Sequence, residues 1–204
     1  MSEQEKKSLK VLVACEFSGT VRRAFRALGH DAWSCDLLPA EDSSEHHFNE
    51  DVINVLNRGW DLMIAHPPCT YLTNAGVCWL HKDPTRWDKM RDGAAFFKTL
   101  YDANIPRICV ENPVMHKYAK DIIQVTQSQT IQPWMFGHPE SKATCLWLRG
   151  LPLLTQTKNV KEEMLKLPPR LQQRLFHLPR SKDRWKERSR TFAGIAAAMA
   201  AQWG

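Results

Sequence analysis

The chain has 204 residues, 43% of them hydrophobic and 25% charged, and it carries a net charge of +6. This length suits one domain over residues 1–204, with residues 1–8 as a disordered tail, and leaves little room for a second core. The polar N-terminus has no secretion signal and no apolar run is long enough to cross a membrane, so we expect a cytoplasmic protein with no membrane partner.

Short apolar runs alternate with segments of helical periodicity. The apolar runs predict buried strands at residues 10–15, 31–35, 61–65, 107–110 and 143–148. Apolar residues at helical spacing predict helices at residues 21–28, 51–56, 88–103 and 191–203. This alternation indicates an α/β fold with a mostly parallel sheet and helices on both faces. Ligands of such sheets bind beyond the carboxyl ends of the strands, so residues at that edge are the functional candidates.

The first candidates follow the first two predicted strands. Phe17, Ser18 and Gly19 form a turn from strand to helix, which places backbone N–H groups at the sheet edge. A plain turn would also use glycine, and without a full G-x-G-x-x-G motif a dinucleotide is not specifically indicated. Asp36 ends the second strand, where Rossmann folds place an acid that binds ribose hydroxyls, although a cap or turn residue is the alternative.

The next predicted strand is followed by Pro67, Pro68 and Cys69. Two prolines fix the backbone, so Cys69 is held rigidly and is a candidate nucleophile. Free cysteines are more often buried and structural, as we expect for positions 15, 35, 109 and 145 inside predicted strands. All six cysteines are expected to be reduced, and because no two form a Cys-x-x-Cys pair we expect no bound metal.

Glu111 and Asn112 follow the strand predicted at residues 107–110. A carboxylic acid at the bottom of a pocket can be protonated and can donate to a ring nitrogen, whereas a surface acid in a turn is the alternative. If Glu111 and Cys69 share the same sheet edge, they can act on one substrate.

Basic residues concentrate in the segment 151–190. They are Arg170, Arg174, Arg180, Lys182, Arg184, Lys186, Arg188 and Arg190, interleaved with Phe176, His177 and Trp185. Basic and aromatic side chains together suit a nucleic acid, with phosphates neutralised and bases stacked, while a solvated basic face is the alternative. We therefore predict that residues 151–190 form a basic insert that contacts nucleic acid.

These motifs, in this order, resemble the DNA cytosine carbon-5 methyltransferase family. The chain looks like a small phage-type member that lacks a full target-recognition domain. The resemblance implies a Rossmann-like fold that uses S-adenosyl-methionine, and it implies that Asp36 binds the ribose and Asp51 lies near the adenine. The implied cofactor contacts are Phe17, Ser18, Gly19, Asp36, Asp51 and Pro67.

The resemblance also implies the reaction, which is methyl transfer to carbon 5 of cytosine in DNA through a covalent Cys69 adduct. Glu111 is similar to the family's acid that binds the cytosine edge, and Lys142 stands near the place of a family arginine. The implied substrate contacts are Pro68, Asn112, Arg188 and Arg190.

Other functions remain open. The alternatives are a methyltransferase acting on free cytosine nucleotide or RNA, and an inactive methyltransferase-like module that binds nucleic acid. A zinc deaminase is rejected, because His138-Pro139-Glu140 matches H-x-E but no P-C-x-x-C follows. Methylation of an exocyclic amine is disfavoured, because Cys69 stands where such enzymes carry an aromatic residue.

Overall fold

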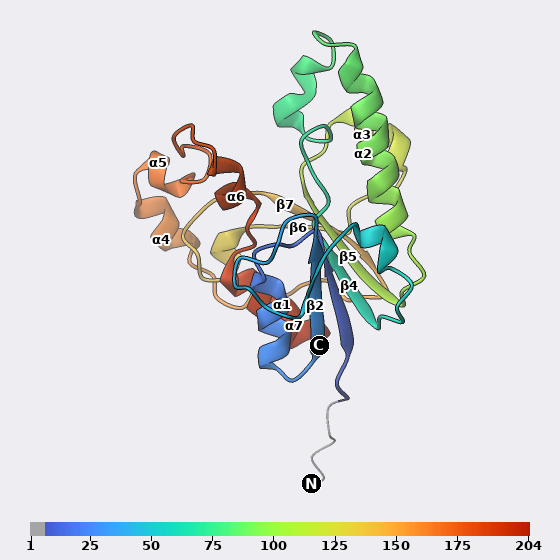
Figure 1. Cartoon of the computed structure of the whole chain (residues 1–204). Helices are drawn as coiled ribbons and strands as arrows, with labels where there is room; N and C mark the ends of the chain where they lie inside the picture. The colour runs from blue at the N-terminus through green and yellow to red at the C-terminus, as the bar shows by residue number, and fades with distance from the viewer. Residues whose placement is uncertain (1–6) are drawn as a thin grey trace.

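In the computed structural model, which describes residues 7–204, seven strands form one sheet (Figure 1). The strands are β1 (Lys10–Ala14), β2 (Asp31–Asp36), β3 (His47–Asn49), β4 (Leu62–Ala65), β5 (Arg107–Pro113), β6 (Gln129–Ile131) and β7 (Thr144–Arg149). Their order is β3-β2-β1-β4-β5-β7-β6, and β7 runs antiparallel to both β5 and β6. The predicted disordered tail, residues 1–8, lies outside the described residues except for its last two.

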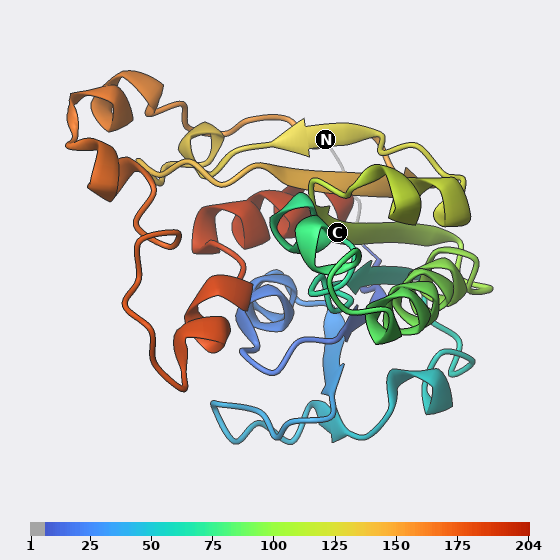
Figure 2. The same ribbon diagram turned by 90° about the horizontal axis from the view of Figure 1, so that it is seen from above.

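Helices cover both faces of the sheet, as Figure 2 shows from above. The α-helices are α1 (Thr20–Ala27), α2 (Thr85–Tyr101), α3 (Lys117–Ile123), α4 (Lys161–Lys166), α5 (Pro169–Gln172), α6 (Arg184–Ser189) and α7 (Ala193–Trp203). Short 3-10 helices are η1 (Val52–Asn54), η2 (Asn74–Trp79) and η3 (Pro133–Met135). Helices α1 and α7 pack together on one face, and α2 and α3 pack together on the other.

The apolar pattern of each element accounts for its place in these layers. Strands β1 and β4 are buried almost throughout, because helices on both faces leave no polar side for the central strands of a parallel sheet. On α2, the buried residues Met90, Ala94, Phe97 and Leu100 recur three or four positions apart and form a single apolar stripe. The small alanines of α7 allow close packing against α1.

The predicted fold class, a Rossmann-like α/β domain with a mostly parallel sheet and helices on both faces, is confirmed. The central order 3-2-1-4-5 is that of the Rossmann fold, and β7 is inserted antiparallel between β5 and β6. The reversed direction of β7 and the three-residue strands β3 and β6 were not predicted. The helix predicted at residues 51–56 is the shorter η1.

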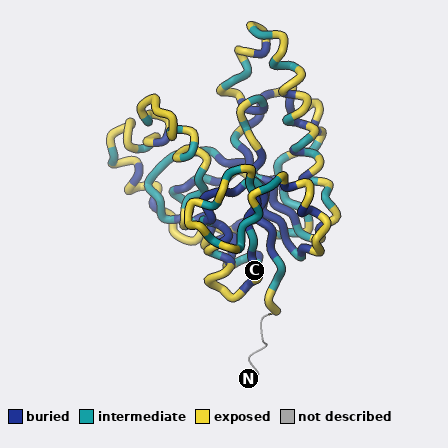
Figure 3. The backbone as a smooth tube through the Cα atoms, in the orientation of Figure 1, coloured by how far each residue is buried: buried dark blue, intermediate teal, exposed yellow. Residues whose placement is uncertain are grey.

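Two segments extend from the sheet at the ends of the strands (Figure 1). The η2 arm, residues 70–87, follows β4 and includes η2 and the first three residues of α2. The C-terminal arm, residues 151–190, lies between β7 and α7 and contains α4, α5 and α6. Figure 3 shows that both arms carry more exposed surface than the sheet. The two arms contribute to the walls of one cavity.

Candidate active site

A cavity of about 860 Å³ opens at the carboxyl ends of β1, β2, β4 and β5. This is the edge at which doubly wound sheets bind their ligands. Most of the predicted site residues line the cavity, namely Phe17, Ser18, Asp36, Pro67, Pro68, Cys69, Glu111, Asn112, Lys142, Arg188 and Arg190. Gly19 and Asp51 do not line it.

The positions of Gly19 and Asp51 give each of them a structural task. Gly19 precedes α1 with φ +68, in the left-handed region where a residue with a Cβ is strained, and an added Cβ would meet the side chain of Arg22. Asp51 is exposed and accepts a hydrogen bond from the Ile53 backbone N–H at 3.0 Å, so it caps η1. Neither observation tests the predicted cofactor contacts of these two residues.

Glu16 holds the first turn, a role that the sequence patterns did not assign to it. Its buried carboxylate accepts hydrogen bonds from the backbone N–H groups of Val21, at 2.7 Å, and Arg22, at 3.2 Å. The side chain thereby satisfies two of the free donors at the start of α1 and faces its positive end. Because a carboxylate already occupies this helix N-terminus, the turn is poorly suited to a phosphate.

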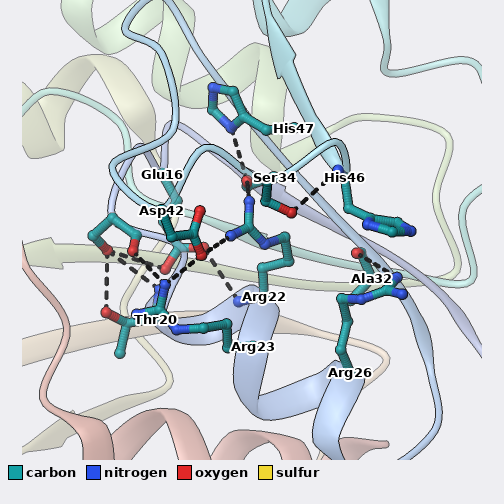
Figure 4. Close-up of polar contacts among 12 residues, drawn as sticks. Glu16, Thr20, Arg22, Arg23, Arg26, Ala32, Ser34, Asp42, His46 and His47 are labelled. Atoms are coloured by element: carbon teal, nitrogen blue, oxygen red, sulfur yellow. Dashed lines mark hydrogen bonds and ion pairs between the residues drawn. The ribbon is translucent and has the colours of Figure 1, made fainter.

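A buried arginine joins the first turn to the loop after β2, as Figure 4 shows. The guanidinium of Arg22 is 1% exposed and donates to Ser34 Oγ at 2.9 Å and to the Asp42 carboxylate. Arg23 donates to the same carboxylate at 2.6 Å. Burial opposes ionisation of Asp42, but the two arginines outweigh it and lower its pKa to about 2. The loop that carries Asp42 is thus held against α1.

Asp36 ends β2 and lines the cavity, and its predicted contact with a ribose stays a prediction. One carboxylate oxygen, Oδ1, accepts from the Leu38 backbone N–H at 3.0 Å, which is the turn role weighed as the alternative. Burial raises the pKa of Asp36, although this hydrogen bond and the nearby His47 oppose the rise. The two roles are compatible, because a carboxylate can accept several hydrogen bonds.

The Pro-Pro-Cys segment is held from the neighbouring strand. Asn112, at 1% exposure, donates from Nδ2 to the Pro67 carbonyl at 3.0 Å. Its Oδ1 is buried without a hydrogen-bond partner. Cys69 is half-buried, and burial raises the pKa of its thiol while the charge of Lys142 opposes the rise. The resting thiol is therefore protonated at neutral pH, and a proton must leave before the sulfur can attack.

His66 and Glu111 form a close pair beside Cys69. His66 Nδ1 lies 2.8 Å from Glu111 Oε2, and the two side chains are 12% and 13% exposed. Burial lowers the pKa of His66, but the hydrogen bond to Glu111 outweighs it and the net pKa is raised. Burial raises the pKa of Glu111, but His66 outweighs it and the net pKa is lowered. The contact therefore favours the pairing of an imidazolium with a carboxylate.

The C-terminal arm covers one side of the cavity. Lys142 Nζ donates to the Arg188 carbonyl at 3.0 Å, and Arg190 forms an ion pair with Glu41 at 2.7 Å. Trp185 of α6 also lies against Phe17. Lys142, Arg188 and Arg190 were predicted as site residues from the sequence, whereas Glu41 was not. The η2 arm contributes Trp79 and Arg86 to the facing wall, and neither was predicted.

Among residues 7–204, no group of three or more His, Cys, Asp or Glu side chains could hold a metal ion. Within the same range, no helix has both the length and the apolar character needed to cross a membrane.

No protein-family model and no curated protein matches the chain. Among solved structures it is similar to a protein described as a DNA modification methyltransferase encoded within an E. coli prophage, at 15% identity and a TM-score of 0.48, over 79% of this chain and 56% of that chain. It is also similar to the Entamoeba histolytica methyltransferase EhMeth, at 17% identity and a TM-score of 0.48, over 76% of this chain and 58% of that chain. A third similar structure is the S. pombe Dnmt2 methyltransferase, at 12% identity and a TM-score of 0.43, over 78% of this chain and 54% of that chain. The chain thus spans little more than half the length of these structures, and its Rossmann-like fold is defined by its own strand order.

Proposed function

We propose that the chain transfers a methyl group from S-adenosyl-methionine to carbon 5 of cytosine in DNA through a covalent adduct on Cys69. The observation that carries this proposal is the convergence of Cys69, Glu111 and Lys142 on one cavity at the carboxyl edge of the sheet. A thiol and a carboxyl group that can exchange a proton with a ring nitrogen suit covalent attack on a cytosine ring, and a nearby cation favours the thiolate.

The residues divide the reaction into two easier steps. The Cys69 sulfur bonds to carbon 6 of the ring, the thiol proton leaves, and the carbon 5–carbon 6 electrons make carbon 5 nucleophilic. A proton shared between Glu111 and ring nitrogen 3 stabilises the electrons pushed into the ring. Carbon 5 then takes the methyl group, a base removes the carbon-5 proton, and the sulfur–carbon 6 bond breaks to restore Cys69.

The residues of the first turn and of β2 fit S-adenosyl-methionine. Phe17 offers an apolar surface, and Asp36 offers a carboxylate for ribose hydroxyls at the end of β2. Glu16 occupies the N-terminus of α1, which suits a cofactor without phosphates. When bound, this cofactor would supply the methyl group from a sulfonium. Gly19 would shape the turn rather than line the pocket.

The C-terminal arm is the part of the proposal that concerns DNA. Arg170 and Arg180 are exposed on this arm, and Arg188 lines the cavity. Such residues bind phosphates regardless of base sequence, whereas base discrimination needs several bidentate pairs worth about 1–3 kcal/mol each. We infer that the chain is one catalytic domain and that this arm is its contact with nucleic acid. We also infer that the arm recognises only a few bases.

The proposal is tested by mass spectrometry of nucleosides from DNA and RNA of cells that express the chain. We expect 5-methylcytosine in DNA with the wild-type chain and none with Cys69→Ala. A purified-protein arm offers duplex DNA, single-stranded DNA, RNA and cytidine nucleotides with labelled S-adenosyl-methionine. If only RNA or only free nucleotide became labelled, that molecule would be the substrate instead of DNA. Label in none of them would favour the inactive binding module.

A further inference from the structure

We propose that His66 is a positioning residue that keeps Glu111 as a carboxylate at rest, so that Glu111 can relay the Cys69 thiol proton to nitrogen 3 of cytosine. This inference rests on the proposed function and adds a residue and a proton path to it. The geometry that carries it is the 2.8 Å contact from His66 Nδ1 to Glu111 Oε2, in the cavity that Cys69 also lines.

The relay follows from the proton inventory of the resting cavity. Burial raises the pKa of Cys69, so its sulfur carries a proton that must leave before attack. Nitrogen 3 of cytosine is an acceptor that must gain a proton as electrons enter the ring. Glu111 interacts electrostatically with Cys69, and its pKa is lowered by His66 despite burial. A carboxylate in that place can accept the thiol proton and deliver it to nitrogen 3.

The step balances without a further reactant. The sulfur–hydrogen bond breaks and the sulfur–carbon 6 bond forms, while the thiol proton passes to Glu111 and then to nitrogen 3. The ring electrons move toward carbon 5, and the net charge of the site is unchanged. When the sulfur–carbon 6 bond later breaks, the proton returns from nitrogen 3 through Glu111 to the sulfur. His66 remains an imidazolium throughout and faces one carboxylate oxygen.

The surroundings of His66 favour the imidazolium. The charged groups that interact with it are Glu111 at the end of β5, Glu16 after β1, Asp36 at the end of β2 and Lys142 before β7. Three of these four groups are acids, so the local charge balance supports a cation at His66. Its Nε2 is buried without a hydrogen-bond partner, which leaves Glu111 as the group that fixes the ring.

Without His66, burial would be the largest influence on Glu111 and would raise the pKa of its carboxyl group. A protonated Glu111 cannot accept the proton of Cys69, so a higher pKa makes the relay less effective. We expect His66→Leu to lower kcat about 100-fold, the low end of the range for general acid–base catalysis. We expect His66→Asn, which keeps an N–H donor but no charge, to recover activity to within roughly tenfold of wild type, because neutral hydrogen bonds are weaker.

The pH profile separates this role from a merely structural one. The pKa of His66 is raised by Glu111, so the imidazolium is present at low pH and is lost as pH rises through that raised value. Wild-type kcat should therefore fall as pH rises through the pKa of His66. This fall, the alkaline limb of the pH profile, should be missing in His66→Asn, which does not titrate. It should remain in His81→Asn, a matched control at an exposed histidine outside the cavity.

Two measurements decide the proposal. Nitrogen-15 histidine NMR, with His66 assigned from the His66→Asn spectrum, should show that Glu111→Gln moves the His66 titration to lower pH. An unchanged titration, or a wild-type pH limb that survives in His66→Asn, would overturn the relay. If the wild-type chain methylated no cytosine substrate, the proposed function would be contradicted, and the relay with it. Binding of S-adenosyl-homocysteine by each variant shows that the cavity is intact.

Discussion

Trp185 of the C-terminal arm packs on Phe17 of the first turn, with ring centroids 5.6 Å apart and planes tilted by 54°. The contact joins the basic arm directly to the turn proposed to hold the cofactor. Trp185 is 50% exposed, so half of its surface remains available to a ligand. The arm therefore forms part of the cavity wall rather than a separate projection.

Removal of the Trp185 ring should weaken cofactor binding. Aromatic pairs contribute about 0.5–1.5 kcal/mol beyond the area that they bury. We expect Trp185→Ala to raise the Kd for S-adenosyl-homocysteine about five- to tenfold by calorimetry. Trp185→Phe keeps an aromatic ring and should stay within about twofold of wild type. Equal affinities for the alanine variant and the wild type would show that the Trp185 ring does not contribute to cofactor binding.

Loss of the Asp42 carboxylate should destabilise the fold. Asp42→Asn leaves the buried Arg22 guanidinium without its anion, and breaking a buried pair costs about 3–5 kcal/mol. Because Asp42 is 30% exposed, we expect about 2 kcal/mol by urea unfolding. Asp88→Asn, in an exposed pair on α2, is the control and should cost less than about 0.5 kcal/mol.

The same pair predicts how stability depends on acid. The pKa of Asp42 is lowered to about 2 in the fold, against a usual value near 3.8. The contribution of Asp42 is thus complete above the usual value and is lost as pH falls toward 2. Unfolding free energies measured from pH 5 to pH 2 should converge for the wild type and Asp42→Asn. Parallel curves over that range would contradict the assignment.

Removal of the Lys142 charge should slow attack by Cys69. Burial raises the pKa of the Cys69 thiol and Lys142 opposes the rise, so Lys142→Met should leave the thiolate scarcer. We expect capture of a fluorocytosine-containing DNA at Cys69 to slow about tenfold, with Lys142→Arg close to wild type because its charge remains. Mass spectrometry of the adduct measures the rate. Equal rates for Met and Arg would show that the charge has no role.

Binding to DNA should depend steeply on salt through the C-terminal arm. Arg170 and Arg180 are exposed, whereas Arg174 is engaged with Glu140 at 3.1 Å and is less free to bind phosphate. Replacing Arg170 and Arg180 by alanine should reduce the slope of log K against log salt by about 2, near 0.9 for each lost phosphate contact.

The control for this experiment lies on α3. Lys117 and Lys120 are exposed there, and neither lines the cavity. Their double replacement by alanine removes the same net charge and should leave the slope unchanged. An equal effect of both pairs would mean that binding follows net charge rather than the arm.

The residues at the carboxyl edge of the sheet were predictable, because the residue types at the end of each strand show where the strand stops. Buried runs stop at polar or proline residues, and parallel strands bring those residues together, which correctly placed Asp36, Cys69 and Glu111 at one cavity. Asp51 was assigned by its order along the chain, and it lies at η1 outside the cavity lining, so its predicted contact near the adenine stays a prediction.

Other features left no signal in the sequence pattern. Strand β3 has three residues and carries His47, so it shows neither an apolar run nor alternation. The direction of β7 depends on the chain path between β6 and β7 rather than on its own residues. The roles of Glu16 and His66 arise from partners five and forty-five residues away, and side-chain pairing of that kind is fixed only in the folded chain.

The path of the C-terminal arm has a consequence for how a chain with this fold can diversify. The arm leaves the sheet after β7 and returns at α7, and Leu146 and Met199 on either side of it belong to one core. Both attachment points are therefore anchored, and exposed loop segments accept insertions more readily than packed elements. Lengthening the exposed loop around Arg180 would extend the arm, and with it the proposed contact to a polynucleotide, without repacking the core. Under the proposed function, target choice could thus change by insertion into the arm, independently of the chemistry proposed for Cys69.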